Sequence, residues 1–341
     1  MSASNGDALL RVEGLRTWFP IRRGLLQRTV GWVRAVDGVD LEVRPAGTLA
    51  LVGESGCGKT TVGRSILRLV EPQEGRVWFD GVDLLGLPRG ELRPYRRRLQ
   101  VVFQDPGASL DPRMRIRDVV AEGMRSFGIG DGEAQRTRRV AELLERVQLD
   151  PDQMWRYPHE FSGGQRQRIC VARALATQPD LVICDEAVSA LDVSIQAQII
   201  NLLRDLQRDL GLAFLFITHD LGVVRYLADE VAVMYLGQIV ERAATRRLFE
   251  APQHPYTRGL LAAVPSVDPQ RRSPPPQVLG DVPSPAHPPP GCRFHNRCPQ
   301  VFERCRREAP ALYPTATGAS RCFLSEEGGR LPGGKNPQLP A

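Results

Sequence analysis

The sequence predicts an α/β protein: a core with a mostly parallel central sheet, a helical subdomain inserted into it, and a small cysteine-rich module at the C-terminal end. Three observations predict this. Short apolar runs alternate with segments of helical period up to about residue 265. The stretch 87–176 interrupts that alternation with mostly helical sequence, and four of the seven cysteines crowd together after residue 290.

Length and composition exclude several classes of protein. With 341 residues, 42% hydrophobic and 25% charged, the chain resembles a soluble globular protein of about two domains rather than a disordered chain or a disulfide-dense mini-protein. No segment reaches the roughly 18 to 20 apolar residues that span a bilayer. The polar N-terminus does not have the pattern of a signal peptide. We therefore expect the chain to be in a reducing compartment, where its cysteines do not form disulfides.

The basic residues are distributed unevenly between the two types. The net charge is +6, and of the 45 basic residues only Lys59 and Lys335 are lysines. Lys335 lies in a Gly/Pro-rich tail, so the predicted folded body keeps a single lysine. Because a planar guanidinium does not replace a compact ammonium in every site, this position is a candidate for a specific role.

The elements follow in order along the chain. Strands are predicted at 48–52, 101–103, 181–184, 213–217 and 231–235, and helices at 60–70, 133–147, 164–176 and 194–210. Composition changes near residue 265. We therefore divide the chain into a core at 8–265, a Pro-rich connector at 266–290, the cysteine-rich module at 291–324 and a disordered tail at 325–341.

A phosphate-binding loop lies between the first predicted strand and the helix after it. The stretch matches G-x-x-x-x-G-K-[ST] at Gly53, Gly58, Lys59 and Thr60. Its glycines let backbone N–H groups turn towards phosphate oxygens, the lysine reaches the β- and γ-phosphates, and the threonine hydroxyl is a Mg²⁺ ligand. The predicted ATP-binding residues of the loop are Gly53, Glu54, Ser55, Gly56, Cys57, Gly58, Lys59, Thr60 and Thr61.

Two adjacent carboxylates end the apolar strand at 181–184. The carboxyl ends of parallel strands meet at the edge of the sheet where ligands bind, so Asp185 is expected beside the Mg²⁺ and Glu186 beside the attacking water.

Further motifs appear in a fixed order after the phosphate loop: Gln104 at a strand end, Ser162-Gly163-Gly164-Gln165 before a basic helix, Asp192 after the carboxylate pair, and His219 at another strand end. Together they make the chain similar to the ATP-binding subunits of ABC transporters, over roughly 9–250. The resemblance implies an ATPase whose two subunits enclose two ATP molecules head to tail.

That resemblance assigns roles to residues. Glu186, His219 and Gln104 would be catalytic, and Thr60, Gln104 and Asp185 would hold Mg²⁺. The signature residues Ser162, Gly163, Gly164 and Gln165 would contact the ATP of a partner subunit, and Asp192 would form the D-loop. For the aromatic residue that stacks on adenine we favour Trp32 over Trp18 and Phe19.

Other stretches resemble the dipeptide/oligopeptide importers, a group that also includes nickel and glutathione carriers. They include Tyr157-Pro-His-Glu-Phe161 before the signature and His254-Pro-Tyr-Thr-Arg258 near the end of the core. The resemblance implies two transmembrane permease subunits, a second ABC ATPase subunit, an extracytoplasmic peptide-binding protein and a peripheral place at the cytoplasmic face of the membrane, with no nucleic acid. The alternatives are a soluble ABC ATPase acting on ribosomes or nucleic acid, and a regulatory iron–sulfur protein that only senses ATP.

The sequence leaves the functions of two stretches open, one rich in cysteine and one rich in arginine. Cys292, Cys298, Cys305 and Cys322 supply the four thiols needed for one [4Fe–4S] cluster or one zinc ion; we favour the cluster, and merely packed cysteines are the third possibility. The five arginines between 292 and 307 would then offset the thiolate charge.

The arginine-rich segment 89–98 is interpreted first as a solvated helix, and second as a contact for lipid headgroups or membrane partners.

Overall fold

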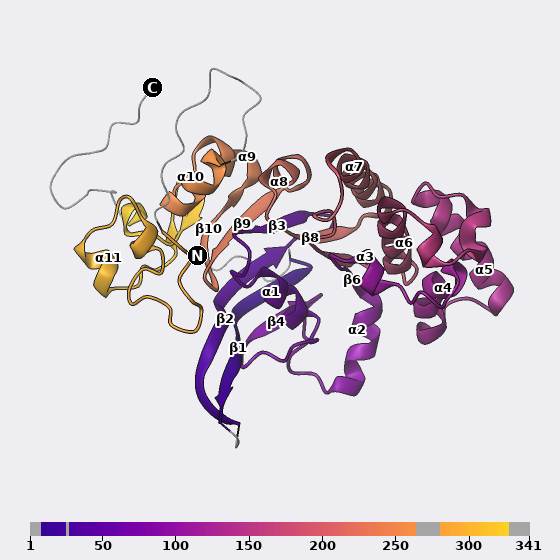
Figure 1. The fold of residues 1–341 in the computed structure, drawn as a ribbon, viewed down its shortest axis with the longest axis horizontal. Helices are drawn as coiled ribbons and strands as arrows, with labels where there is room; N and C mark the ends of the chain where they lie inside the picture. Colours follow the sequence, from indigo (N-terminus) through magenta and orange to yellow (C-terminus); the bar gives the residue numbers. More distant parts are fainter. Residues whose placement is uncertain (1–7, 25–26, 264–279, 327–341) are drawn as a thin grey trace.

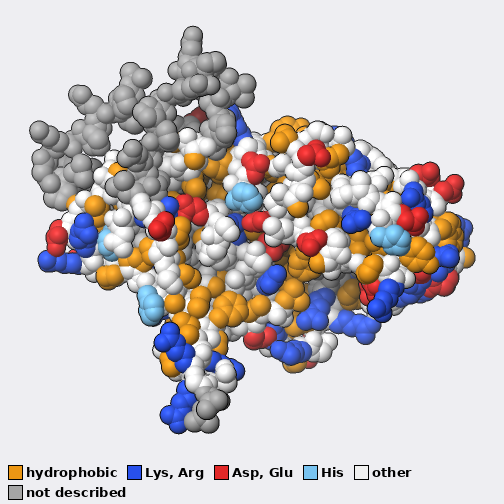
Figure 2. All heavy atoms as spheres, viewed as in Figure 1, with side chains coloured by type: hydrophobic (Ala, Val, Ile, Leu, Met, Phe, Trp, Pro, Cys, Tyr) orange, Lys and Arg blue, Asp and Glu red, His pale blue; other side chains and the backbone are white. Residues whose placement is uncertain are grey.

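The computed structural model describes residues 8–24, 27–263 and 280–326, and these form two β-sheets with helices around them (Figure 1). The smaller sheet is antiparallel, in the order β2-β1-β4-β5. Its strands are β1 (Leu10–Arg23), β2 (Arg28–Val43), β4 (Glu74–Phe79) and β5 (Val82–Asp83). The far end of the β1–β2 hairpin projects from the rest of the molecule (Figure 1), and basic side chains gather on it (Figure 2).

The larger sheet has eight strands in the order β11-β12-β10-β9-β3-β8-β7-β6. The five central and distal strands pair in parallel: β9 (Glu230–Tyr235), β3 (Thr48–Val52), β8 (Ala213–Thr218), β7 (Leu181–Asp185) and β6 (Leu99–Val102). Strands β3, β7 and β8 are buried along their whole length, as parallel strands covered on both faces are. The other three strands pair antiparallel at one edge: β10 (Gln238–Ala244), β12 (Gly318–Ser320) and β11 (Tyr313–Pro314).

Helices cover the large sheet and form a separate group at one end of the molecule (Figure 1). The helices along the core are α1 (Lys59–Ile66), α2 (Arg93–Arg98), α7 (Val193–Leu210), α8 (Leu221–Leu227), α9 (Thr245–Glu250) and α10 (Pro255–Ala262). The group at the end consists of α3 (Pro106–Ser109), α4 (Ile116–Phe127), α5 (Glu133–Arg146) and α6 (Gly163–Leu175). The C-terminal module, with α11 (Glu303–Arg307), lies at the opposite end.

The predicted α/β fold is confirmed, including its parallel centre and its helical insertion. The strand predicted at 101–103, within the mostly helical stretch 87–176, is confirmed as β6, which pairs with β7 in the core sheet. Two details were not predicted. One is the antiparallel sheet of the first 83 residues. The other is that the module at 291–324 is joined to the core, since β12 pairs with β10 and extends the same sheet.

The connector and tail are described only in part. Residues 264–279 and 327–341, which hold most of both, lie outside the described residues. Within the predicted tail, η6 (Phe323–Ser325) is followed by Glu326, which pairs with Arg304, so the ordered module extends past residue 324. Among the helices that the structure describes, none has the length and apolarity to cross a membrane.

Candidate functional site

The phosphate loop lies between β3 and α1, as the sequence predicts. Gly58 precedes α1 with a φ of 111°, and a Cβ there would lie 2.0 Å from the carbonyl oxygen of Ala35. A Cβ on Gly53 would lie 2.2 Å from the oxygen of Met234. Both positions therefore require glycine, for its backbone freedom and for the close approach of the neighbouring chain.

The ammonium of Lys59 is held inside this loop. Its Nζ donates to the carbonyl oxygens of Gly53 at 2.8 Å and of Glu54 at 3.0 Å, and the residue is 4% exposed. Cys57 packs beside it, and burial raises the pKa of this thiol, so it stays protonated at neutral pH. A compact charged group thus occupies the centre of the loop.

The predicted magnesium ligands Thr60 and Asp185 lie together. The hydroxyl of Thr60 donates to Oδ1 of Asp185 at 2.9 Å, which joins the start of α1 to the end of β7. Burial raises the pKa of the Asp185 carboxyl, while the bond from Thr60 acts in the opposite direction. An oxygen-rich corner at the end of a buried strand is the kind of site in which Mg²⁺ binds beside phosphates.

Glu186, Gln104 and His219 converge on the same edge of the sheet. Oε1 of Glu186 lies 3.5 Å from Nδ1 of His219, and Nε2 of Gln104 lies 3.4 Å from Oγ of Ser189. Glu186 adopts a φ of 50°, an uncommon backbone conformation for a residue other than glycine. The three predicted catalytic residues are therefore neighbours, although they come from three separate segments.

An open cavity of about 490 Å³ joins these residues to the phosphate loop. Its size lies in the ordinary range for small-molecule sites. Sequence reasoning did not find two of its apolar lining residues, Leu221 of α8 and Leu260 of α10, because nothing in their local sequence distinguishes them from core leucines. The lining residues are Val52, Gly53, Glu54, Ser55, Gln104, Glu186, His219, Leu221 and Leu260.

The signature residues do not line this cavity. Ser162 caps α6: its Oγ accepts from the Gln165 N–H at 3.3 Å, and the Gln165 side chain accepts from the Ser162 N–H at 3.0 Å. Ser162 and Gly163 are exposed. The next glycine, Gly164, is buried against α7, where a Cβ would lie 2.5 Å from Cγ2 of Ile195. Asp192 caps α7, with Oδ1 accepting from the Ile195 N–H at 2.9 Å.

Trp32 is not among the residues that line the cavity. It lies on β2, is 43% exposed and pairs across the sheet with Pro20. Of the other two candidates, Phe19 is 39% exposed and Trp18 has the Arg34 guanidinium over its ring. The adenine-stacking role of Trp32 stays a prediction.

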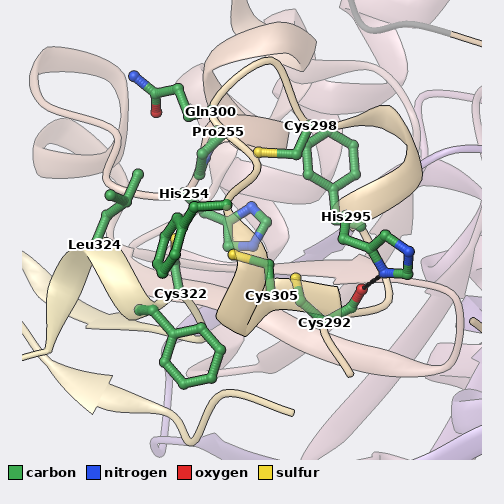
Figure 3. A pocket seen from close by; sticks show the side chains of 12 residues that line it. His254, Pro255, Cys292, His295, Cys298, Gln300, Cys305, Cys322 and Leu324 are labelled. Atoms are coloured by element: carbon green, nitrogen blue, oxygen red, sulfur yellow. Dashed lines mark hydrogen bonds between the residues drawn. The ribbon is translucent and has the colours of Figure 1, made fainter. Parts of the chain in front are cut away.

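The four C-terminal cysteines line one small, apolar pocket (Figure 3). Burial raises the pKa of Cys292 and of Cys298 to about 11, and that of Cys322 to about 12, so these thiols stay protonated at neutral pH. Nevertheless, within the described residues no three or more His, Cys, Asp or Glu side chains are arranged to hold a metal ion. The predicted cluster is therefore not supported by this arrangement.

The arginines around these cysteines have other partners than the thiols. Arg297 pairs with Glu54, Arg293 with Asp37, Arg304 with Glu308 and Glu326, and Arg307 with Glu303. These four arginines therefore already have carboxylate partners, and the prediction that they offset thiolate charge stays a prediction.

Comparison with protein families agrees with this geometry. The model of the ABC transporter family matches residues 36–189, and the model described as "Oligopeptide/dipeptide transporter, C-terminal region" matches residues 240–305. A putative peptide import ATP-binding protein of Brucella ovis is 51% identical over 318 residues, which cover 93% of this chain and 98% of the relative. The chain belongs to the ABC transporter ATP-binding proteins. As a member of this family it is an ATPase.

Other relatives and solved structures agree with membership of this family. A probable peptide ABC transporter ATP-binding protein of Sinorhizobium fredii is 50% identical and covers 92% of this chain and 88% of its own length. A glutathione import ATP-binding protein of Salmonella paratyphi A is 56% identical over 83% of this chain, which spans 45% of that protein. The structure of cbiO1 from Clostridium perfringens, part of an ABC transporter complex, has a TM-score of 0.61 at 26% identity over 72% of this chain and 92% of its own. A dimeric ATP-binding cassette bound to ADP and phosphate also has a TM-score of 0.61, at 27% identity over 70% and 99% of the two chains.

Proposed function

We propose that this ABC ATPase hydrolyses ATP to energise the import of di- or oligopeptides. One observation carries the catalytic part: the phosphate loop, Glu186, His219 and Gln104 line a single cavity at the carboxyl edge of the parallel sheet. The cargo class is supported by the match of residues 240–305 to the peptide-transporter C-terminal region and by relatives named for peptide import along nearly their whole length.

In this proposal the residues have separate tasks. The loop N–H groups and Lys59 bind the phosphates of ATP, and the carbonyls of Gly53 and Glu54 hold the Lys59 ammonium inside the loop. Glu186 accepts a proton from the attacking water, and His219, 3.5 Å away, orients the Glu186 carboxylate. Thr60, Gln104 and Asp185 would hold Mg²⁺, which would supply positive charge to neutralise the phosphates.

The proposal includes a second ATPase subunit. Ser162 and Gly163 are exposed at the start of α6 and lie outside the lining of the cavity, which fits a role in contacting the nucleotide of another subunit. We place the assembly at the cytoplasmic face of the membrane with two permease subunits and an extracytoplasmic peptide-binding protein. Nickel or glutathione remains the second candidate for the cargo; the Salmonella relative is named for glutathione import.

We also propose that the four C-terminal thiols bind a metal centre, a [4Fe–4S] cluster ahead of zinc. This proposal rests on the number and kind of donors and not on their arrangement, which does not by itself form a metal site among the described residues: four thiols line one apolar pocket. Anaerobically purified protein is expected to contain iron and acid-labile sulfide in stoichiometric amounts, and replacing any of the four cysteines with serine should remove both. Iron-free protein, with or without zinc, would contradict the cluster.

The ATPase mechanism is tested by replacing Glu186 with Gln. We expect hydrolysis to be lost while ATP binding is retained and an ATP-bound dimer accumulates, as measured by phosphate release and light scattering. Wild-type turnover in this variant would show that Glu186 is not the base. Cargo is tested separately: deletion of the gene should abolish uptake of labelled di- and oligopeptides, whereas loss of nickel or glutathione uptake alone would exclude a peptide importer.

A further inference from the structure

The C-terminal module contacts the phosphate loop directly. Arg297 belongs to η5 (His295–Arg297), between Cys292 and Cys298 in the sequence. Its two terminal nitrogens donate to the two carboxylate oxygens of Glu54, at 2.7 and 3.0 Å. Glu54 follows the first glycine of the phosphate loop, and the two side chains are 9% and 28% exposed. A bidentate, mostly buried pair of this kind is among the stronger and more directional polar contacts in proteins.

A second contact holds the same residue by its backbone. The N–H of Glu54 donates to the hydroxyl of Tyr256 on α10 at 2.9 Å. Tyr256 is buried and packs against Phe294 of the C-terminal module, with ring centroids 5.4 Å apart. Phe294 also lines the cysteine pocket. Both the side chain and the backbone of Glu54 are therefore fixed by residues that lie about 200 or more positions later in the chain.

The phosphate loop needs support of this kind. Gly56 has a φ of 79°, and a Cβ built there would meet nothing within 4 Å, so this part of the loop is not packed against the core. The contacts of Lys59 lie within the loop itself. A loop that binds phosphates through backbone N–H groups gains affinity when it is already ordered before the nucleotide arrives. From outside the loop, the Gly237 N–H donates to the carbonyl of Cys57 at 2.9 Å, and the pair between Glu54 and Arg297 adds to that order at the first turn of the loop.

We propose that Arg297 is a positioning residue for ATP: through Glu54, the C-terminal module holds the phosphate loop in the conformation that binds the nucleotide. This goes beyond the proposed function, since it gives the cysteine-rich module a direct effect on the ATP site whatever the transported cargo. Arg297 does not touch the phosphates itself. Its contribution is to the affinity for ATP and not to the chemical step.

The test is a double-mutant cycle in the full-length chain, with the Mg²⁺ complex of the non-hydrolysable analogue AMP-PNP as the probe in calorimetric titrations. Arg297→Gln and Glu54→Gln are each expected to weaken binding about tenfold, which corresponds to about 1.4 kcal/mol. The double variant should also bind about tenfold more weakly and not a hundredfold, because both changes remove the same contact. In ATPase assays the change should appear in KM, with kcat at saturating ATP close to wild type.

A matched control comes from the same module. Arg304→Gln removes another arginine with carboxylate partners, Glu308 and Glu326, that are not part of the phosphate loop, and it should leave the affinity unchanged. Thermal unfolding without nucleotide checks that each variant is folded. If Arg297→Gln does not fold, Arg297→Lys decides the question, because it keeps the charge and loses the forked contact with Glu54; wild-type affinity in this variant would also overturn the proposal.

Three results would overturn the proposal: wild-type affinity in folded Arg297→Gln or in Glu54→Gln, additive losses in the double variant, or an equal loss in Arg304→Gln. Additive losses would mean that the two residues act independently, and an equal loss in Arg304→Gln would mean that the module acts only through general stability. Failure of the proposed function is distinguishable, because it would appear as absent ATPase activity or absent peptide uptake with the wild-type chain.

Discussion

Replacing Lys59 with Arg is the sharpest single test of how the phosphate loop works. The ammonium lies within 3.0 Å of two loop carbonyls and only 4% of the residue is exposed. A guanidinium is larger and planar, so the loop must open to admit it. Overpacking a site of this kind costs about 1–3 kcal/mol. Arginine keeps the positive charge, so the change isolates shape from charge.

Poor alignment with the phosphates adds to that cost, since a hydrogen bond to a charged group contributes about 1.5–3 kcal/mol. The two costs together come to at least about 2.5 kcal/mol of binding energy, so we expect ATP affinity to fall at least about 60-fold. Calorimetric titration of AMP-PNP into each purified protein measures this. Lys335→Arg is the matched control, because it makes the same chemical change at the other lysine of the chain. Affinity within about threefold of wild type in Lys59→Arg would refute the argument that this site requires a compact ammonium.

Three other substitutions test the rest of the structure. Gly164→Ala places a methyl 2.5 Å from Cγ2 of Ile195, so we expect loss of ATPase activity and a lower Tm. Adding Ile195→Ala should restore both in part. If it restores neither, the cause is not steric. Asp185→Asn should abolish Mg²⁺-dependent hydrolysis yet raise the Tm of the nucleotide-free protein. Burial raises the folded-state pKa of Asp185, so ionising it opposes folding at pH values above its ordinary pKa of 3.8, and the gain should disappear towards acid pH in melting curves. Arg98→Ala removes two partly exposed ion pairs, so it should destabilise by only about 1 kcal/mol in denaturant titrations, less in high salt, without changing the KM for ATP.

The parallel centre of the fold could be predicted because its strands are buried on both faces. A run such as Thr48–Val52 then contains no polar position that faces water, and it stands out in the sequence. The antiparallel sheet near the N-terminus could not be predicted in the same way. Strands β1 and β2 carry several register shifts, and part of the hairpin is exposed on both faces, so no regular alternation marks them.

The residues of the candidate site also differ in how far the sequence could predict them. Residues that act through local backbone geometry, such as Gly58 and Lys59, belong to a contiguous motif and were found. The convergence of Gln104, Glu186 and His219 was expected from the resemblance, since each follows a strand of one sheet. Arg297 could not be found, because its partner lies 243 residues away and only the folded chain brings the two together.

The arginine-rich segment shows why charge alone was a poor guide. The sequence left α2 open between a solvated helix and a lipid contact. Arg97 donates to the carbonyl of Thr177, and Arg98 bridges Asp80 and Asp180, so these two side chains fasten the helix to the core. Arg89, Arg93 and Arg96 of the same segment are exposed, so a contact with lipid headgroups or membrane partners stays a prediction.

The ion pairs of several arginines give a structural reason for the excess of arginine over lysine in this chain. Arg98 bridges two carboxylates from separate segments, Arg125 bridges Asp118 and Glu133, and Arg297 grips both oxygens of Glu54. A guanidinium can make such forked contacts because its donors are fixed in one plane, whereas an ammonium acts as a point charge. Lysine at these positions would keep the charge and lose the fork. Lys59, the single lysine of the described chain, lies inside a tight loop where a planar guanidinium would not fit. The substitutions Lys59→Arg and Arg297→Lys should therefore both weaken ATP binding. The first puts a group into the loop that is too large, and the second loses the forked contact with Glu54.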